Sequence, residues 1–317
     1  MILALRALGV GDLATATPAL RALRVAHPDR ELVLAAPGWL APLVDLVGGV
    51  DRLVPTDGLG RPDPAVRVPR IAVNLHGRGP ESHRMLARTS PGRLLAYANP
   101  EAGHLDGPDW RADEHEVDRW CRLLDWYGIP ADHTDLDLRR PPPGGAPTGV
   151  TVLHPGSKVP AKCWPPGRFA ALARQLAARG HRVVLTGSSG ERATAQRIAD
   201  AAGLPADAVL AGRTDLGGLA ALVAYARLVV SGDTGVAHLA TGYRTASVVL
   251  FGPVSPARWG PPPGRPRHRA LWAGAGGGPR WDGVGSHPAL TVIGVDEVLA
   301  AVDEVERAVR VSGAVAA

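Results

Sequence analysis

Short apolar runs alternate with amphipathic stretches along the whole chain. In the first half, the runs that predict strands are ILAL (2–5), LVLAA (32–36), DRLVP (51–55) and IAVNL (71–75). A helix is predicted through TPALRALRVA, and DEHEVDRWCRLLDWYG (113–128) has the periodicity of an amphipathic helix that ends at Gly128.

The second half repeats this alternation. Its predicted buried strands are VTVLH (150–154), RVVLT (182–186), AVLAG (208–212), RLVVSG (227–232) and ASVVLFG (246–252). Helices such as PGRFAALARQLAARG occupy the gaps, with Gly180 as a C-terminal stop. Strands separated by helices require right-handed crossovers, so each half predicts a parallel sheet that is covered on both faces.

A segment rich in proline and glycine, RRPPPGGAPTG (139–149), separates the two patterns. Such a segment continues neither a helix nor a central strand. We therefore predict an α/β protein with two Rossmann-like parallel-sheet domains that face each other across a cleft. The predicted boundaries are residues 1–140, a linker over 141–149, a second domain over 150–294 and a C-terminal helix within 295–317 that packs across the domain boundary.

Length and composition agree with a globular chain of two domains. The sequence has 317 residues, of which 45% are hydrophobic and 21% charged. No apolar run approaches the roughly 20 residues that span a bilayer, and Arg6 interrupts the start too early for a signal peptide. Two cysteines, Cys121 and Cys163, are too few for a disulfide framework, so we expect a cytoplasmic location.

The formal charge of +5 is compatible with nucleic acid, a membrane surface or a phosphorylated substrate. Nucleic acid is not expected as a partner, because aromatic residues make up only 4% of the chain and the arginines are spread without a basic helix or tail. Peripheral membrane association stays open, and the sequence does not decide the oligomeric state.

Loops rich in glycine and small hydroxyl residues follow the strands of the second half: HPGS (154–157), TGSSGE (186–191), SGDTG (231–235) and FGPVSP (251–256). One such loop is usually only a turn with a helix cap. Because ligands of open α/β sheets bind at the carboxyl ends of the strands, four successive loops favour a site for a diphosphate.

The same edge carries an unusual pair of cations. Among 35 basic residues only Lys158 and Lys162 are lysines, and both lie in the loop HPGSKVPAKCW (154–164). A compact ammonium group suits a phosphate oxygen at a tight site. The alternative is that two surface lysines lie together by chance. We favour Lys162 as the functional group and Lys158 as a helper.

The N-terminal loop contains Gly9-x-Gly11-x-x-Ala14, a loose form of the dinucleotide-binding pattern. Asp12 within it would repel a pyrophosphate, and LAAPG offers no acidic residue to hold a ribose. An NAD-dependent oxidoreductase is therefore the weaker interpretation. Asp12 either caps a helix or serves as a general base that accepts a proton from an attacking hydroxyl.

Three segments carry a family resemblance. They are SGDTGVAHLATGYRTASVVLFGPVSPARWGP (231–261) with its D-T-G-x-x-H and F-G-P, HPGSKVPAKCWPPGRFAALARQL, and GVGDLATATPALRAL near the start. They resemble glycosyltransferase family 9, the ADP-heptose-dependent heptosyltransferases. The resemblance implies a GT-B fold and an inverting, metal-independent transfer of a sugar from a nucleoside-diphosphate donor to an acceptor hydroxyl, without a cofactor.

The resemblance also implies roles for individual residues. Asp12 resembles the catalytic base, and Lys162 the lysine that contacts the donor's phosphate or sugar. The residues expected to bind the donor are Ser157, Lys158, Lys162, Thr186, Gly187, Glu191, Asp233, Thr234, Gly235 and His238. Helix capping by Asp233 or Thr234, a first-turn acid at Glu191 and a core histidine at His238 are the alternatives.

The acceptor is less defined. NLHGRGPESHR (74–84) follows a predicted strand, so His76, Arg78, His83 and Arg84 are candidates to line its pocket together with Gly11; solvated loop residues are the alternative. The acceptor is a lipopolysaccharide core, a cell-wall glycan or a small metabolite. A non-catalytic nucleotide-sugar sensor is a third interpretation. No metal site is predicted, and Asp135-x-Asp137 is taken as incidental.

Overall fold

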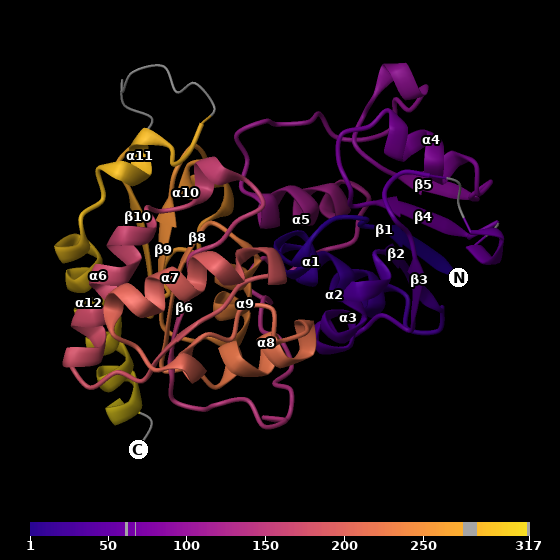
Figure 1. The fold of residues 1–317 in the computed structure, drawn as a ribbon. Helices are drawn as coiled ribbons and strands as arrows, with labels where there is room; N and C mark the ends of the chain where they lie inside the picture. Colours follow the sequence, from indigo (N-terminus) through magenta and orange to yellow (C-terminus); the bar gives the residue numbers. More distant parts are fainter. Residues whose placement is uncertain (61–62, 67, 275–283, 316–317) are drawn as a thin grey trace. The chain divides into compact units, whose positions relative to one another are not determined.

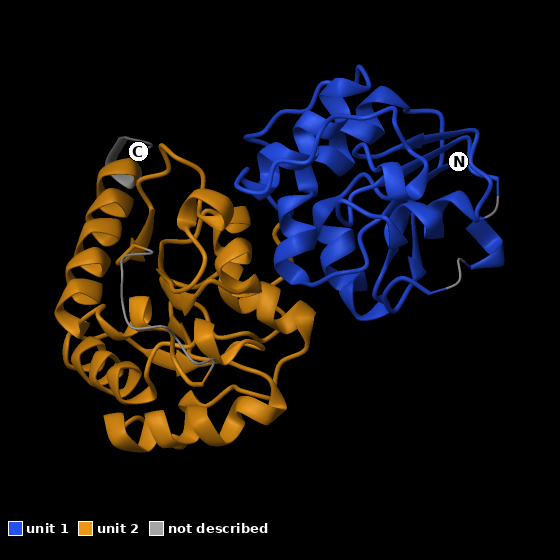
Figure 2. Ribbon diagram, turned by 90° about the horizontal axis from the view of Figure 1, so that it is seen from above, with its two compact units in different colours: residues 1–139 blue, residues 140–317 orange. Residues whose placement is uncertain are grey.

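The computed structural model describes residues 1–60, 63–66, 68–274 and 284–315. Their contacts divide the chain into two compact units, Met1–Arg139 and Arg140–Ala317. Figure 1 follows the chain through its helices and strands, and Figure 2 colours the two units. Each unit has a parallel sheet of its own.

In the first unit the described residues form a five-stranded parallel sheet in the order β3-β2-β1-β4-β5. The strands are β1 (Ile2–Leu5), β2 (Leu32–Ala36), β3 (Arg52–Pro55), β4 (Ile71–Asn74) and β5 (Arg93–Leu95). Ile2 pairs with Leu32 on one side and with Ile71 on the other. The direction of winding reverses between β1 and β4, which makes their carboxyl ends the switch point of this sheet.

The helices of the first unit lie between these strands in sequence, except α5, which follows β5. They are α1 (Val10–Thr15), α2 (Thr17–Ala26), α3 (Ala41–Val47), α4 (Glu81–Ala87) and α5 (Glu116–Trp126), with the 3₁₀ turns η1 (Gly38–Leu40), η2 (Pro64–Val66) and η3 (Pro100–Ala102). Every residue of β1 is buried because helices cover both faces of the sheet, which is why ILAL lacks alternation. Helix α5 starts at Glu116, later than predicted, since the ring of His115 accepts a hydrogen bond from the amide of Val117 and caps it.

The second unit has the sheet order β10-β9-β8-β6-β7 among its described residues. Its strands are β6 (Thr151–His154), β7 (Val183–Leu185), β8 (Leu228–Gly232), β9 (Ser247–Phe251) and β10 (His268–Trp272). Its helices are α6 (Pro166–Ala178), α7 (Arg192–Ala202), α8 (Leu216–Ala224), α9 (Gly235–Tyr243), α10 (Pro256–Trp259), α11 (Pro288–Thr291) and α12 (Val295–Val315), and its 3₁₀ turns are η4 (Pro160–Lys162), η5 (Ser189–Glu191) and η6 (Ala206–Ala208). The switch point of this sheet lies between β6 and β8.

The predicted α/β class with two parallel sheets is confirmed. The strand predicted at AVLAG (208–212) is wrong. Only Val209 forms a bridge, to Leu185, because η6 immediately precedes this run and Gly212, at φ +70°, turns the chain away. The edge strand is instead β10, which pairs in parallel with β9 from His268 onward. Edge strand β5 was not predicted either, since it spans three residues of which only Leu95 is buried.

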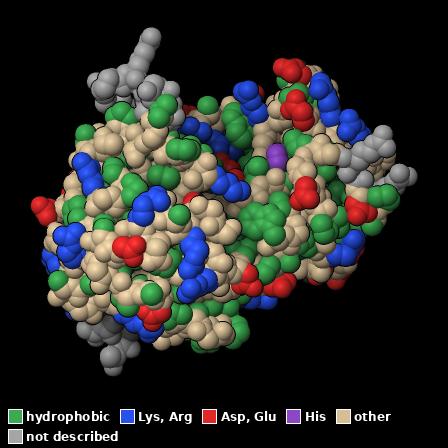
Figure 3. Space-filling model, viewed as in Figure 1, with side chains coloured by type: hydrophobic (Ala, Val, Ile, Leu, Met, Phe, Trp, Pro, Cys, Tyr) green, Lys and Arg blue, Asp and Glu red, His purple; other side chains and the backbone are tan. Residues whose placement is uncertain are grey.

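The long helix α12 packs against α6, β9 and β10, and Val298, Val302 and Val305 join the core of the second unit. Its predicted packing across a domain boundary, like the boundaries themselves, stays a prediction. None of the helices in the described part of the chain has the length and apolar character needed to cross a bilayer. On the face drawn in Figure 3, Lys and Arg side chains are spread among acidic and hydrophobic ones and form no single stripe.

Candidate active site

Lys162 and Asp233 meet at the switch point of the second sheet. Lys162 is the last residue of η4, which follows β6, and Asp233 directly follows β8. Since β6 and β8 are neighbours, both residues stand at the same sheet edge, and Lys162 Nζ donates to Asp233 Oδ2 at 2.6 Å. The lysine side chain is 25% exposed and the aspartate 6%. The ammonium group is therefore fixed by a buried carboxylate and still accessible to a ligand.

Two glycines allow the lysine loop to lie directly on the strand ends. A Cβ on Gly232 would stand 2.6 Å from the carbonyl oxygen of Lys162, and a Cβ on Gly252 would stand 3.1 Å from that of Ala161. The first distance is shorter than real Cβ contacts and the second is tighter than most of them, so a side chain at either position would press on η4. From the sequence we expected glycines of these loops to let backbone amides approach a ligand. At these two positions the glycines instead leave room for the backbone of the loop that carries Lys162.

The N-terminus of α9 adds donors at this edge. Thr234 is the N-cap in extended conformation, and its side chain makes no capping bond. Thr234 Oγ1 is buried and, among the described residues, has no hydrogen-bond partner. The amides of Gly235 and Val236 belong to the first turn, where a helix has no internal acceptors for them. An ammonium group, an unpaired hydroxyl and first-turn amides are all groups that favour a bound anion.

His238 lies one turn further along α9. Its ring stands edge-on to that of Trp259 in α10, with the centroids 5.7 Å apart. The histidine is only partly buried, so the fully buried core histidine considered from sequence is not what the structure has. Thr234 and His238 are four residues apart, so α9 places them on the same face.

Glu191 joins the loops that follow β6 and β7. Its Oε2 accepts hydrogen bonds from the amide of Ser188 at 2.7 Å and from the Ser188 hydroxyl at 2.8 Å. A Cβ on Gly156 would come within 2.1 Å of Oε1, and a Cβ on Gly187 within 3.1 Å of Oε2. The carboxylate thus caps η5, as the simpler interpretation expects, and also lies against the HPGS loop.

The remaining residues that were predicted to bind the sugar donor differ in exposure and in their hydrogen bonds. Ser157 Oγ accepts from the amide of Val159 at 3.2 Å, and Lys158 is exposed. Thr186 is buried: its amide bonds the Leu153 carbonyl at 3.0 Å, and its hydroxyl lies 3.0 Å from Nδ1 of His154. The structure therefore brings Lys162, Asp233, Thr234, Gly235 and Glu191 to the loops of one edge, while the hydroxyl and amide of Thr186 are engaged inside the unit.

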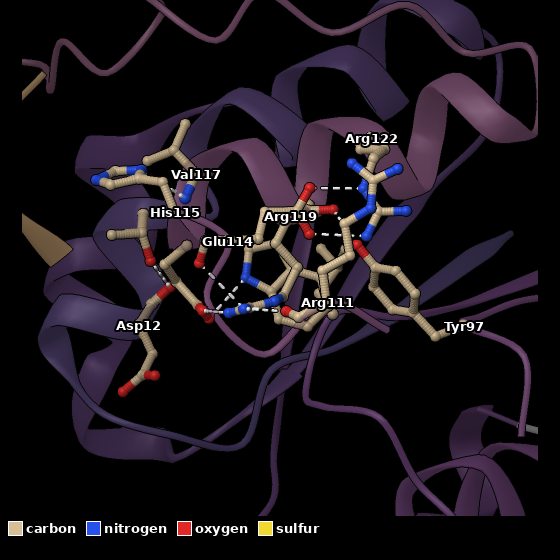
Figure 4. Close-up of polar contacts among 12 residues, drawn as sticks. Asp12, Tyr97, Arg111, Glu114, His115, Val117, Arg119 and Arg122 are labelled. Atoms are coloured by element: carbon tan, nitrogen blue, oxygen red, sulfur yellow. Dashed lines mark hydrogen bonds and ion pairs between the residues drawn. The ribbon is translucent and has the colours of Figure 1, made fainter. Parts of the chain in front are cut away.

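In the first unit, Asp12 stands at the start of α1, directly after β1. Its Oδ2 accepts from the amide of Gly9 at 3.0 Å, so it caps the helix, and its side chain remains 27% exposed. Arg6, which is fully buried, reaches Asp12 twice: Nε donates to its carbonyl at 3.0 Å and Nη2 lies 3.5 Å from Oδ1. Figure 4 shows Asp12 together with Arg119 and Arg122 of α5. Asp12 is therefore both a cap and an accessible carboxylate.

Arg6 has a second acidic partner, Glu116 at the start of α5. Nη2 of Arg6 donates to Glu116 Oε1 at 2.8 Å, and this oxygen also accepts from Trp120 Nε1 at 2.9 Å. Arg119 holds the other oxygen of Glu116. Burial alone would raise the pKa of Glu116, but the two guanidinium groups and the indole outweigh it, and the pKa is lowered.

Sequence reasoning missed Arg6 and Glu116. Two features of the sequence could have indicated them. Arg6 directly follows the wholly apolar run ILAL, and Glu116, Arg119 and Trp120 have the spacing that places them on one face of a helix.

His76 follows β4, the neighbour of β1, so it belongs to the same switch point as Asp12. Its amide donates to Asn74 Oδ1 at 3.0 Å, and its Nδ1 is buried without a partner among the described residues. Burial and the nearby Arg6 lower the pKa of His76, and Asp12 opposes them. Burial and Arg6 thus favour the neutral form of this imidazole.

The other residues of the predicted acceptor loop lie apart from this edge or face solvent. Arg78 is exposed, and its carbonyl accepts from Asn99 at 2.9 Å. His83 is buried, with one ring nitrogen 2.8 Å from the Tyr97 carbonyl and the other 3.1 Å from Asn74 Nδ2, so it belongs to the interior. Arg84 donates to the Glu101 carbonyl.

Gly11, in the first turn of α1, is half-buried. Within the described ranges, no group of three or more His, Cys, Asp or Glu side chains has an arrangement that would hold a metal ion.

The model of glycosyltransferase family 9 (heptosyltransferase) matches residues 110–279, which is more than half of the chain. The chain belongs to glycosyltransferase family 9. The family match runs from α5 through β10, so it includes Glu116, Lys162 and Asp233 and leaves Asp12 outside.

Curated relatives carry the name heptosyltransferase. The chain is 37% identical over 151 residues to lipopolysaccharide heptosyltransferase 1 of Pseudomonas aeruginosa, covering 45% of this chain and 41% of that protein. It is 37% identical over 106 residues to lipopolysaccharide heptosyltransferase 2 of Escherichia coli, covering 32% and 30%. The chain thus matches less than half the length of these family 9 relatives.

Solved structures match over nearly the whole chain. The structure of Escherichia coli ADP-heptose lipopolysaccharide heptosyltransferase II has a TM-score of 0.78 at 22% identity and covers 98% of this chain and 99% of its own. A family 9 glycosyltransferase from Veillonella parvula has a TM-score of 0.77 at 20% identity, with 96% of each chain covered. The heptosyltransferase WaaC of Escherichia coli with ADP reaches 0.70 at 18%, covering 96% and 97%. These likenesses confirm the GT-B type of α/β fold for this family 9 chain.

Proposed function

We propose that this family 9 protein is an inverting glycosyltransferase of the heptosyltransferase type, which moves a heptose from ADP-heptose to an acceptor hydroxyl. The family match over residues 110–279 carries the proposal. Relatives named heptosyltransferases and a structural neighbour solved with ADP support the choice of sugar and nucleotide. A cytoplasmic location, which suits the free cysteines Cys121 and Cys163, goes with it.

The second unit is assigned to the donor. As the bond between sugar and diphosphate breaks, negative charge builds on the departing oxygens. The Lys162 ammonium, the amides at the start of α9 and the Thr234 hydroxyl would stabilise that charge, because fixed donors need no reorganisation during the reaction. Asp233 would orient Lys162 through their contact at 2.6 Å. Glu191 and His238 are proposed to contact the nucleoside and the sugar.

The first unit is assigned to proton transfer. Asp12 would accept the proton of the acceptor hydroxyl, which then attacks the anomeric carbon from the face opposite to the diphosphate and inverts it. Its accessible carboxylate and its neighbours Arg6 and His76 support this role. The acceptor is a glycan or a small molecule with a free hydroxyl, and His76, Arg78 and Gly11 are proposed to line its pocket.

The two alternative interpretations are less favoured. An NAD-dependent oxidoreductase would need an acidic residue where β2 ends, and that position is Ala36. A non-catalytic nucleotide-sugar sensor predicts that Asp12→Ala leaves both donor binding and biological activity unchanged. The family match favours neither of them.

A panel of nucleotides and nucleotide sugars tests the donor. ADP and ADP-heptose are expected to raise the midpoint of thermal unfolding, while GDP, UDP and dTDP forms leave it unchanged, because a ligand that binds only the folded state stabilises it. Release of ADP from ADP-heptose, with and without candidate acceptors, then tests the chemistry. Stabilisation by NAD without competition from ADP, or no response to any ADP sugar, would contradict the proposal.

A further inference from the structure

One buried guanidinium serves two carboxylates in the first unit. Nη2 of Arg6 lies 2.8 Å from Glu116 Oε1 and 3.5 Å from Asp12 Oδ1. Arg6 is fully buried and the Glu116 side chain is 7% exposed, whereas that of Asp12 is 27% exposed. The shorter contact thus belongs to the buried acid, and the longer contact to the acid that solvent can reach.

The charges around Asp12 come from several elements. Arg6 follows β1, Glu116 and Arg119 stand on α5, and His76 follows β4. Burial and Arg6 lower the pKa of His76, which favours its neutral form. The two guanidinium groups and the two carboxylates therefore balance when Asp12 is ionised. Without Glu116, Asp12 would be the remaining acidic partner of Arg6 in this cluster.

This balance of charges affects how well Asp12 can act as a base. A nearby cation favours the ionised form of a carboxylate, and the same preference makes that carboxylate a weaker proton acceptor. Arg6 alone would hold Asp12 in place but reduce its basicity. A second carboxylate on the same guanidinium offsets the charge and leaves the positioning hydrogen bonds of Arg6 unchanged. Charges in a buried cluster are also screened less by salt than exposed ones.

We propose that Glu116 is a positioning residue for the reaction: through Arg6, it sets how strongly Asp12 accepts a proton. The inference rests on the proposed role of Asp12 as the general base. It concerns a residue on α5 that, in this arrangement, touches Asp12 only by way of the arginine between them.

Glu116→Gln tests the proposal, because the amide keeps an oxygen for Arg6 and Trp120 but removes the charge. The acidic limb of the kcat/KM profile is expected to move to lower pH by about one unit, and the plateau rate to fall roughly threefold to tenfold. Glu116→Asp, which restores the charge, should return the limb toward its original position.

The matched control is Glu114→Gln, which removes an acidic partner of Arg122 in the same unit and should leave the limb in place. An unchanged limb in Glu116→Gln would overturn the proposal, because a purely structural role would lower only the unfolding temperature. Arg119→Gln provides an independent variant if Glu116→Gln does not fold. It removes a positive charge, so the limb should move to higher pH; no movement would count equally against the proposal.

A titration without substrate separates this inference from the proposed function. With ¹³C-labelled aspartate, the carboxyl signal of Asp12, assigned by its loss in Asp12→Asn, is expected to titrate at lower pH in Glu116→Gln than in the original protein. If no ADP-heptose is turned over but the difference appears, the proposed reaction fails and the charge coupling stands. Identical titrations of Asp12 would overturn the coupling even in an active enzyme.

Discussion

The Lys162 ammonium lies 2.6 Å from Oδ2 of Asp233, a carboxylate with only 6% of its side chain exposed. The two residues are 71 positions apart in sequence and stand together because β6 and β8 are neighbours. A buried anion fixes the position of the lysine while a quarter of its side chain stays accessible. The pair defines the centre of the proposed donor site.

Loss of this ammonium should impair the reaction. For Lys162→Met we expect kcat/KM for ADP-heptose to fall by about 100-fold or more, because the main charge stabilising the departing diphosphate is gone. The ammonium is also a compact point charge, so Lys162→Arg should not restore activity. Lys158→Met is the control: Lys158 is exposed in the same loop and should lose roughly threefold or less, in line with the small effect of most surface substitutions. Steady-state ADP release measures all three, and equal losses in Lys162→Met and Lys158→Met would contradict the assignment.

Removing the proposed base should affect turnover and leave donor binding intact. Asp12→Asn keeps an oxygen that can cap α1 but cannot accept a proton, so kcat should fall by about 10² to 10⁴. Calorimetric titration should give an unchanged affinity for ADP. Turnover at the original rate would remove Asp12 from the mechanism and would favour the sensor interpretation.

The contact of Gly232 with the lysine loop predicts a steric effect. In Gly232→Ala the new Cβ would meet the Lys162 carbonyl at 2.6 Å, so η4 must move. We expect the free energy of unfolding to fall by about 1–3 kcal/mol and the affinity for ADP to fall with it. Gly167→Ala, in α6 with nothing within 4 Å of its Cβ, is the control and should be neutral or slightly stabilising. Urea unfolding of both variants measures this change. An unchanged free energy of unfolding in Gly232→Ala would show that the loop adapts to the new side chain.

His268 makes the stability of the second unit depend on pH. Burial, helped by Arg265 and Arg267, lowers the pKa of His268 to about 4, and its Nδ1 lies 2.9 Å from the Ser247 hydroxyl. Between pH 6.5 and about 4 the unfolded chain binds a proton that the folded chain does not, so stability falls as the pH falls through this range. The full effect is up to about 3 kcal/mol.

Replacing this histidine should remove the slope. Unfolding free energies between pH 7 and pH 4.5 are expected to decline less in His268→Asn than in the original protein, because asparagine has no proton to gain. The comparison concerns the slope with pH, so a constant loss of stability in the variant does not affect it. Equal slopes in both proteins would mean that His268 does not titrate in this way.

The sequence predicted the central strands of both sheets because these strands are buried and therefore continuously apolar, as in ILAL and LVLAA. It predicted the edge that carries Lys162 and Asp233, since parallel strands bring their carboxyl ends together. The sequence did not predict the contact between these two side chains.

Other features depend on contacts that no local pattern contains. Arg6 and Glu116 are 110 positions apart, and only the folded sheet brings α5 over β1. His83 looked like a loop residue, yet hydrogen bonds to Asn74 and Tyr97 hold it inside the unit. AVLAG had the composition of a strand, but its flanking turns leave a single bridge.

The division of the chain after Arg139 has an evolutionary consequence. Every group that we assign to the nucleotide lies between positions 154 and 238, and every group assigned to the proton lies between 6 and 119. Preference for a sugar nucleotide and preference for an acceptor are then encoded by separate stretches of the gene. Recombination at one point near codon 140 would exchange one specificity while keeping the other, so hybrids of related genes are a direct route to new glycosides.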